Sequence, residues 1–237
     1  MKKIILTGAT GGLGTELVDT ILSYNIGELV CVYRNEKKFN KIRNEQKKLK
    51  GYQVLENDDF SKLFSWVEDK ETNEIMLILN AFSITPIKKM GEMRSDEIEN
   101  FVYGNITRNT LLINKTINHC KINGIALRII NLDSGAADRP FTGWGNYCAS
   151  KSFINSLLSV VSKENSDYRV VSVDPGVIDT NMQEEIRSAD KEVFDQVEMF
   201  KDYKKKGLLK SPKIVAIQIC EKYLINWTAK FLREKLE

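Results

Sequence analysis

The amino-acid sequence predicts an α/β fold: one doubly wound parallel β-sheet between two layers of helices, built as a single domain over residues 1–237. Short apolar runs alternate with longer amphipathic stretches, which is the order of parallel strands joined by right-handed helical crossovers. A glycine-rich turn follows the first apolar run, where such folds bind ligands. No repeat, low-complexity linker or shift in composition marks a second domain, and 237 residues suit one α/β domain.

The individual elements follow from this rhythm. The expected strands are Ile4–Thr7, Leu29–Tyr33, Ile75–Leu79, Leu127–Leu132 and Arg169–Val173, with a further strand ending just before residues 57–59. The expected helices are Leu13–Tyr24, Asp59–Asp69, Asp96–Cys120 and Asn146–Glu164. The segment Gln183–Gly207 interrupts the rhythm because it is polar, charged and helix-favouring, and we expect it to form a charged lid over the substrate.

Composition excludes several classes of partner. Charged residues make up 28% of the chain and nearly cancel to a net charge of +3, so neither nucleic acid nor a membrane surface is expected as the main partner. The four cysteines form no Cys-x-x-Cys pair and no metal-ligand spacing, so we expect no metal and reduced thiols. No apolar run approaches the ~18 residues of a membrane span, and no signal peptide is evident. A cytoplasmic protein is expected.

The first strand leads directly into a glycine-rich turn and a helix start, as in a Rossmann-type fold. Gly8 permits the tight turn after Thr7, Gly12 lets the backbone approach a pyrophosphate, and Gly14 allows close packing of helix on strand. The helix start at Leu13 offers unpaired N–H groups and a positive dipole end to an anion. An ordinary flexible turn is the alternative, but the strand–turn–helix context favours a dinucleotide site.

The ends of the second and third strands bear on the choice of dinucleotide. An acidic residue after the second strand would bind a ribose 2′-hydroxyl, whereas a basic one accommodates a 2′-phosphate. Arg34 stands at this place with Asn35 beside it, so NADP(H) is favoured over NAD, a surface arginine being the alternative. Near the adenine we expect Asp58, among the candidates 57–59, although a helix N-cap would explain it equally well.

A tyrosine, a lysine and a serine are placed to form a reaction centre. Tyr147 and Lys151 are four residues apart, so they share one face of a helix. Ser134 follows the strand Leu127–Leu132, so all three can meet at the carboxyl edge of the sheet. Protonating a reduced carbonyl needs an acid, and a nearby ammonium is expected to lower the pKa of the phenol toward neutrality. Each residue alone is common in helices or turns, whereas the ordered set is not.

Together these motifs resemble the short-chain dehydrogenase/reductase family. The glycine spacing of residues 8–14 after Thr7, the Tyr147-x-x-x-Lys151 pair and the preceding Ser134 carry the resemblance. It implies that Lys151 also binds the nicotinamide ribose and that Asn105, in the preceding helix, helps hold a water chain to the lysine. It further implies that the cofactor is lined by Asn80, Ala81, Pro175, Gly176, Val177, Ile178 and Thr180. Phe82 departs from the family, which has glycine there.

The resemblance extends to one branch of that family, which holds sepiapterin reductases and benzil reductases. It is carried by Thr85–Glu92, Ser134–Ala137, Gly143–Cys148 and Asp174–Gln183. It implies NADPH-dependent reduction of a ketone, such as a 1,2-diketone or a sepiapterin-like compound, in a homodimer or homotetramer. The tail Tyr223–Glu237 does not resemble the pteridine anchor of sepiapterin reductase. Expected pocket walls, for which core packing is an equal alternative, are Phe82, Phe141, Trp144 and Met182.

Two other functions stay open at this point. Some proteins of this fold bind the cofactor without catalysis and act as regulators or scaffolds. They usually lose the tyrosine or the lysine, whereas this chain keeps both Tyr147 and Lys151. The same chemistry could also run as NAD-linked alcohol oxidation, which the response of NADPH and NADH to a change at Arg34 would distinguish.

Overall fold

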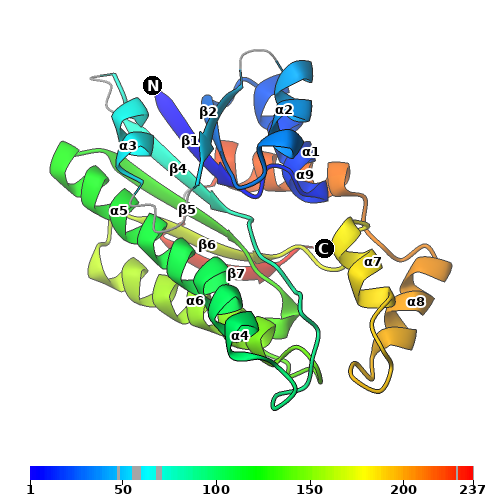
Figure 1. The fold of residues 1–237 in the computed structure, drawn as a ribbon. Helices are drawn as coiled ribbons and strands as arrows, with labels where there is room; N and C mark the ends of the chain where they lie inside the picture. Colours follow the sequence, from blue (N-terminus) through cyan, green and yellow to red (C-terminus); the bar gives the residue numbers. More distant parts are fainter. Residues whose placement is uncertain (47–48, 55–59, 68–70, 228, 237) are drawn as a thin grey trace.

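Buried apolar and β-branched runs form the strands of a parallel sheet in the computed structural model, which describes residues 1–46, 49–54, 60–67, 71–227 and 229–236. The sheet order is β3-β2-β1-β4-β5-β6-β7, and the paired strands are parallel (Figure 1). The strands are β1 (Lys2–Thr7), β2 (Glu28–Tyr33), β3 (Lys50–Gln53), β4 (Glu74–Leu79), β5 (Ala126–Leu132), β6 (Arg169–Asp174) and β7 (Phe231–Lys235). The order reverses between β1 and β4, which is where open sheets of this kind bind ligands.

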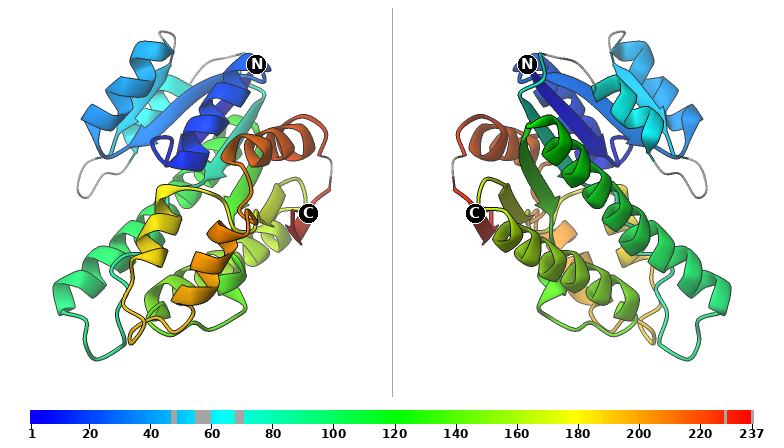
Figure 2. Two further views of the ribbon diagram at one scale, coloured as in Figure 1. Left: turned by 90° about the vertical axis from the view of Figure 1, so that its right-hand side faces the viewer. Right: turned by 90° about the vertical axis from the view of Figure 1, so that its left-hand side faces the viewer.

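Helices cover both faces of the sheet and create two cores. The helices α1 (Gly12–Ser23), α2 (Glu36–Glu45) and α9 (Pro212–Ile219) pack on one face, and α3 (Ser61–Val67), α5 (Arg108–Asn123) and α6 (Gly145–Glu164) pack on the other (Figures 1 and 2). Successive strand residues point to opposite faces. Ile4 and Leu6 therefore belong to the first core, whereas Ile5 belongs to the second.

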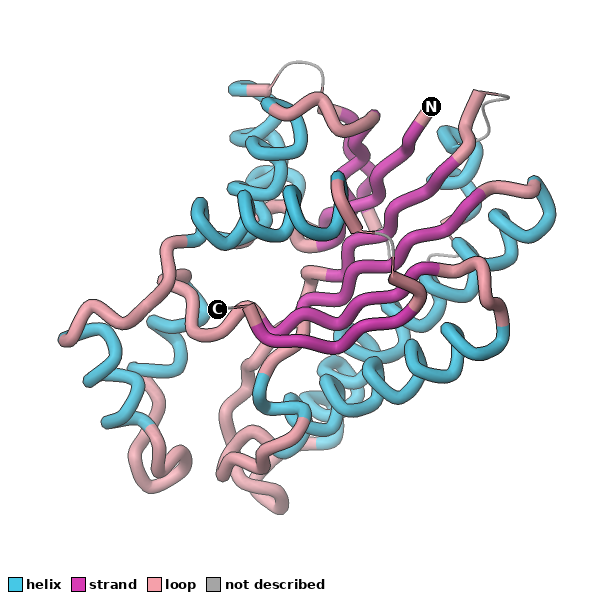
Figure 3. The backbone as a smooth tube through the Cα atoms, turned by 180° about the vertical axis from the view of Figure 1, so that it is seen from behind, coloured by secondary structure: helices cyan, strands magenta, loops and turns pink. Residues whose placement is uncertain are grey.

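Three shorter helices lie beyond the carboxyl edge of the sheet. They are α4 (Ser95–Val102), α7 (Asn181–Arg187) and α8 (Val197–Lys205). Seen from behind in Figure 3, α7 and α8 extend away from the sheet on the side where the strands end. They build a third apolar cluster with the start of α6, separate from the two cores of the sheet. This third cluster supports the residues that form the outer wall of the site.

The fold agrees with the sequence prediction in its main lines and differs in four places. All five expected strands with stated bounds are present, but α2, α9 and β7 were not predicted. The expected helix Asp96–Cys120 is divided into α4, one π-helical turn (Tyr103–Thr107) and α5.

Among the helices that the structure describes, none combines the length and apolar character needed to span a bilayer.

The lid segment Gln183–Gly207 is less polar in structure than its composition suggested. Its charged residues surround an apolar side formed by Ile186, Phe194, Val197 and Phe200, all of which are buried. The segment is therefore an ordered, packed part of the fold. Its charged residues lie on the outer surface, and its role as a lid over the substrate stays a prediction.

Candidate active site

A cleft of about 1350 Å³ runs along the carboxyl edge of the sheet, between the loops that follow the strands and helix α7. Asp58 lies outside the described residues. Every other residue singled out in the sequence lines this cleft: Thr7, Gly8, Gly12, Leu13, Gly14, Arg34, Asn35, Asn80, Ala81, Phe82, Asn105, Ser134, Phe141, Trp144, Tyr147, Lys151, Pro175, Gly176, Val177, Ile178, Thr180 and Met182. The topology therefore brings residues from the whole chain to one place, while their individual roles stay predictions.

The glycine loop has the backbone geometry of an anion cradle. Gly8 has a φ of +69°, and an added Cβ would lie 2.9 Å from the backbone nitrogen of Ala81. At Gly14 an added Cβ would lie 2.0 Å from the carbonyl oxygen of Gly8, so this glycine is required by close packing. Helix α1 begins without a side-chain cap and without an acidic residue in its first turn. Its N–H groups and dipole are thus available to a phosphate.

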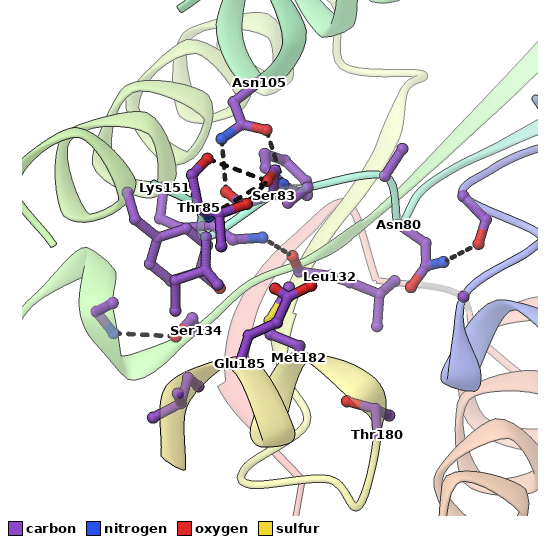
Figure 4. Close-up of a pocket in the computed structure, with 18 of the residues that line it drawn as sticks. Asn80, Ser83, Thr85, Asn105, Leu132, Ser134, Lys151, Thr180, Met182 and Glu185 are labelled. Carbon is purple, nitrogen blue, oxygen red and sulfur yellow. Dashed lines mark hydrogen bonds between the residues drawn. The ribbon is translucent and has the colours of Figure 1, made fainter. Parts of the chain in front are cut away.

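Thr7 and Asn80 brace this loop with their side chains. The hydroxyl of Thr7 accepts hydrogen bonds from the backbone nitrogens of Asn80 (2.9 Å) and Ala81 (3.0 Å). The side-chain amide of Asn80 donates to the carbonyl oxygen of Gly8 at 3.0 Å (Figure 4). Both polar side chains hold the ends of β1 and β4 together. Thr7 and Asn80, which are predicted to lie beside a cofactor, therefore also have a structural role.

The end of β2 presents cationic side chains to the cleft. Arg34 is exposed and lines the cleft, as does Lys38, which the sequence analysis missed. Asn35 caps α2, because its side-chain oxygen accepts from the backbone nitrogen of Lys38 at 3.0 Å. Asn35 therefore has a local structural function, and Arg34 and Lys38 are the cations at this end of the cleft.

Tyr147 sits at the base of the cleft and is 6% exposed. Burial raises the pKa of its phenol, a hydrogen bond with Ser134 opposes that rise, and the nearby carboxylates Asp133 and Asp174 add to it. The sequence analysis expected Lys151 to lower this pKa, and that expectation is wrong for this structure. The phenol is therefore held in its protonated form.

Lys151 is buried beside Tyr147, and its own pKa is shifted in the opposite direction. It is 2% exposed, and burial lowers the pKa of its ammonium to about 7, although Asp133 and Asp174 favour the charged form. Its Nζ donates to the carbonyl oxygen of Leu132 at 2.6 Å (Figure 4) and lies 3.2 Å from the ring centroid of Phe82. Near neutral pH the side chain is thus about half charged.

Asn105 lies in the π-helical turn between α4 and α5. Its side-chain oxygen accepts from the backbone nitrogen of Ser83 at 2.9 Å, and its nitrogen donates to the Ser83 carbonyl oxygen at 2.8 Å (Figure 4). The amide thereby clamps the loop that follows Phe82. The backbone carbonyl oxygen of Asn105 accepts from the side-chain nitrogen of Asn109 at 2.8 Å. Such π turns are frequent at functional sites, and here the turn places the Asn105 amide against the backbone of Ser83.

The loop after β6 closes the cleft from the opposite side. Gly176 has a φ of +77°, and its backbone nitrogen donates to Asp174 at 2.9 Å. An added Cβ on Gly12 would lie 2.9 Å from the methyl carbon of Thr180, so the glycine loop and this loop touch. In this structure Gly12 is required by that contact. The two loops together form the continuous rim of the cleft.

Aromatic rings form the outer wall of the cleft. The indole of Trp144 stacks on Phe194 with centroids 4.5 Å apart and an angle of 9°, and it packs edge-on against Tyr147 at 5.7 Å. Phe141 lies 5.0 Å from Trp144. Phe194 is fully buried and supports Trp144 without lining the cleft, and it was missed because it sits in a charged stretch of sequence. Glu185, also missed, is exposed on α7 and points into the cleft in Figure 4.

The model of the family described as short chain dehydrogenase matches residues 2–191. The chain is a member of the short-chain dehydrogenase family. A benzil reductase ((S)-benzoin forming) of Bacillus cereus is 29% identical over 227 residues, covering 91% of each chain. The benzil reductase of Bacillus subtilis is 32% identical over 226 residues, covering 91% of this chain and 90% of the relative. A sepiapterin reductase of Rattus norvegicus is 28% identical over 197 residues, covering 76% and 75%.

Solved structures agree on the fold of this short-chain dehydrogenase. The structure titled KRED1-Pglu enzyme superposes with a TM-score of 0.86 at 21% identity, covering 98% of this chain and 100% of that one. A structure titled ElxO with NADP bound gives a TM-score of 0.77 at 18% identity, covering 98% and 96%. The predicted family and branch are thus confirmed, and the chain is an oxidoreductase that acts on CH–OH or C=O groups.

Proposed function

We propose that this protein is an NADPH-dependent carbonyl reductase that reduces a ketone, with Tyr147 as the proton donor. The observation that carries the proposal is the shared cleft: Tyr147, Ser134 and Lys151 line the same cavity as the glycine loop and Arg34. A nicotinamide held along the loop and a carbonyl held at Tyr147 would therefore lie side by side. Bound NADPH supplies the hydride, and the chain supplies position and the proton.

The residues around the cleft fit a phosphorylated dinucleotide. The uncapped start of α1 offers N–H groups to the pyrophosphate. Arg34 and Lys38 are exposed at the end of β2, where a 2′-phosphate is accommodated in this fold. A guanidinium presents several donors in one plane that matches a phosphate, which supports this role for Arg34.

Proton transfer follows from the ionisation of the three central side chains. Because burial raises the pKa of Tyr147, its phenol carries a proton at neutral pH and acts as an acid. The hydroxyl of Ser134 bonds the phenol and is positioned to bond the substrate oxygen as well. In its protonated form Lys151, anchored on Leu132, would stabilise the phenolate left after transfer. A protonated phenol is the form that a reduction requires of its proton donor.

The proposed substrate is a compact, partly aromatic ketone with a second carbonyl beside the first. Trp144, Phe141 and Met182 line the cleft next to Tyr147, and an aromatic wall suits such a substrate. The names of the two Bacillus relatives point to the same chemistry, since both are benzil reductases. Benzil is therefore the first substrate to test.

The decisive experiment follows NADPH oxidation with benzil by the wild type and by Tyr147→Phe. Loss of the proton donor should reduce kcat by at least about 10²-fold, the usual contribution of a general acid. Tyr168→Phe is the matched control, because Tyr168 is a buried tyrosine away from the cleft, and it should leave kcat unchanged. If no ketone in a broad panel gives turnover that depends on Tyr147, a cofactor-binding scaffold becomes the better explanation.

Nucleotide choice is tested at Arg34. Arg34→Ala should raise the Kd of NADPH about 10-fold or more, because a charge-assisted phosphate contact is lost, and should leave NADH binding nearly unchanged. Arg43→Ala is the control, since Arg43 is an exposed arginine of α2 that does not line the cleft. Equal losses for both nucleotides would remove the 2′-phosphate assignment and reopen the NAD-linked alternative.

We also propose that the enzyme is a cytoplasmic homodimer or homotetramer. Large apolar side chains remain exposed along α5 and α6, including Leu111, Phe153 and Val160. A row of this kind is better explained by a second copy than by solvent. Sedimentation velocity on the wild type and on Phe153→Lys measures the assembly, and a monomer at micromolar concentration would contradict it.

A further inference from the structure

Directly before Ser134 stands a carboxylate that the proposed reaction does not use. The side chain of Asp133 is 1% exposed. Its Oδ2 accepts from the side-chain nitrogen of Asn155 at 2.7 Å and from Nε of Arg233 at 3.1 Å. Its Oδ1 is buried and has no hydrogen-bond partner among the described residues. The burial of this carboxylate is compensated by the hydrogen bond from Asn155 and by nearby cations, of which Arg233 makes the direct contact.

Arg233 binds two parts of the loop that carries Ser134. While its Nε donates to Asp133, its two terminal nitrogens donate to the two oxygens of Asp138 at 2.8 Å and 2.7 Å. Asp138 follows the single 3₁₀ turn Gly135–Ala137, so the guanidinium spans the turn that follows Ser134. Bidentate contacts of this kind fix orientation as well as charge. The cation comes from the last strand, β7, which no sequence motif connects to the site.

The same carboxylate acts on the two central ionisable groups. Asp133 favours the protonated form of both Lys151 and Tyr147. Among the described residues, Asp174 at the end of β6 also acts on both groups, and its side chain accepts from the backbone nitrogen of Gly176. The thiol of Cys148 acts on Tyr147 as well. Any change in the charge balance at Asp133 must therefore reach Lys151.

We propose that Arg233 is a positioning residue of the reaction centre, whose cation balances Asp133 and thereby sets the charge that Lys151 and Tyr147 face. The inference concerns the chain's own side chains. It rests on the proposed function only for its consequence in catalysis. The last strand would then be an electrostatic part of the active site as well as the edge of the sheet.

Two variants that remove opposite charges should shift the titration of Lys151 in opposite directions. Arg233→Met removes a cation, so Lys151 should hold its proton more tightly and titrate higher. Asp133→Asn removes an anion at constant shape, so Lys151 should titrate lower. The shift in Asp133→Asn should be on the order of one pH unit, and the shift in Arg233→Met should be smaller, because Arg233 is 36% exposed and screened by solvent. The double variant should titrate between the two single variants.

The measurement is the NMR titration of the lysine ε-methylene signal that disappears in Lys151→Met, recorded on the protein without nucleotide. Lys222→Met is the control, since Lys222 pairs with Glu234 at 2.8 Å and does not line the cleft, and it should not move the midpoint. Arg233→Lys keeps the charge and should keep the midpoint. The alkaline limb of the kcat/KM profile with benzil should shift in the same directions as the NMR midpoints.

The outcomes separate this inference from the proposed function. Midpoints that stay still, or that move in the same direction in both single variants, would show that Arg233 has only a structural role. If Arg233→Met does not fold, Asp133→Asn still tests the proposal. A Lys151 midpoint that does not fall in this variant overturns the proposal. If benzil and the ketone panel give no turnover, the proposed function fails. The directions in which the NMR midpoints move would still test the role of Arg233.

Discussion

Lys151 is a buried amine, and replacing it by methionine should make the protein more stable at neutral pH while abolishing reduction. Burial lowers the pKa of the native ammonium from 10.5 to about 7. Between these values the unfolded chain holds a proton that the native protein lacks, so the free energy of unfolding rises with pH through this window. Methionine has a similar shape and no proton to lose. The stability of Lys151→Met should therefore lack this rise.

The magnitude follows from the two pKa values. From pH 7 to pH 9 the native lysine goes from half protonated to neutral, while the unfolded lysine stays protonated. Linkage then gives about 2 kcal/mol of added stability in the wild type over these two units. The raised pKa values of the buried thiols Cys31, Cys120 and Cys220 affect both proteins equally and cancel in the comparison.

The assay is urea unfolding of the wild type and Lys151→Met at several pH values between 7 and 9. We expect Lys151→Met to be more stable at pH 7 and the two curves to converge by about 2 kcal/mol as the pH reaches 9. Lys62→Met controls for the loss of an exposed lysine and should run parallel to the wild type. Parallel curves for Lys151→Met would refute the argument, because the native ammonium would then titrate as it does in the unfolded chain.

Two further changes test the packing of the site. Gly14→Ala should lower the free energy of unfolding by more than about 2 kcal/mol in urea titrations. The added Cβ would lie 2.0 Å from the backbone oxygen of Gly8, and no flexible side chain can move to relieve the clash. An unchanged urea midpoint would contradict this close packing. Phe82→Leu should lower the pKa of Lys151, because the aromatic face over its ammonium is lost while burial remains, and the lysine ε-methylene signal measures it; a midpoint that stays in place would show that the ring contributes no charge stabilisation.

The sequence predicted the parts of the site that local chain geometry dictates. The glycine loop is readable because a tight turn after a strand needs glycines at particular positions, and Gly8 and Gly14 have the geometry expected of them. The pair Tyr147 and Lys151 is readable because residues four apart share a helix face. Phe82 was marked as a departure from the family, and the structure places its ring over the lysine.

The remaining parts depend on contacts between segments far apart in the chain. Arg233 and Asp133 are 100 residues apart, and neither has a local pattern that suggests a pair. The lowered pKa of Lys151 depends on complete burial, which the spacing of residues does not show. Phe194 is buried within a stretch of charged residues, so the average polarity of the segment concealed its role in the aromatic wall.

The π-helical turn at Tyr103–Thr107 makes this region unusually sensitive to chain length. An α-helix advances by about 100° per residue, so deleting one residue from the turn would rotate α4 by that angle relative to α5. The buried Phe101 would swing away from the third apolar cluster, and Asn105 could no longer clamp both backbone groups of Ser83. Point substitutions along α4 and α5 are tolerable by comparison. The chain between Ser95 and Asn123 therefore permits changes of residue far more readily than changes in the number of residues.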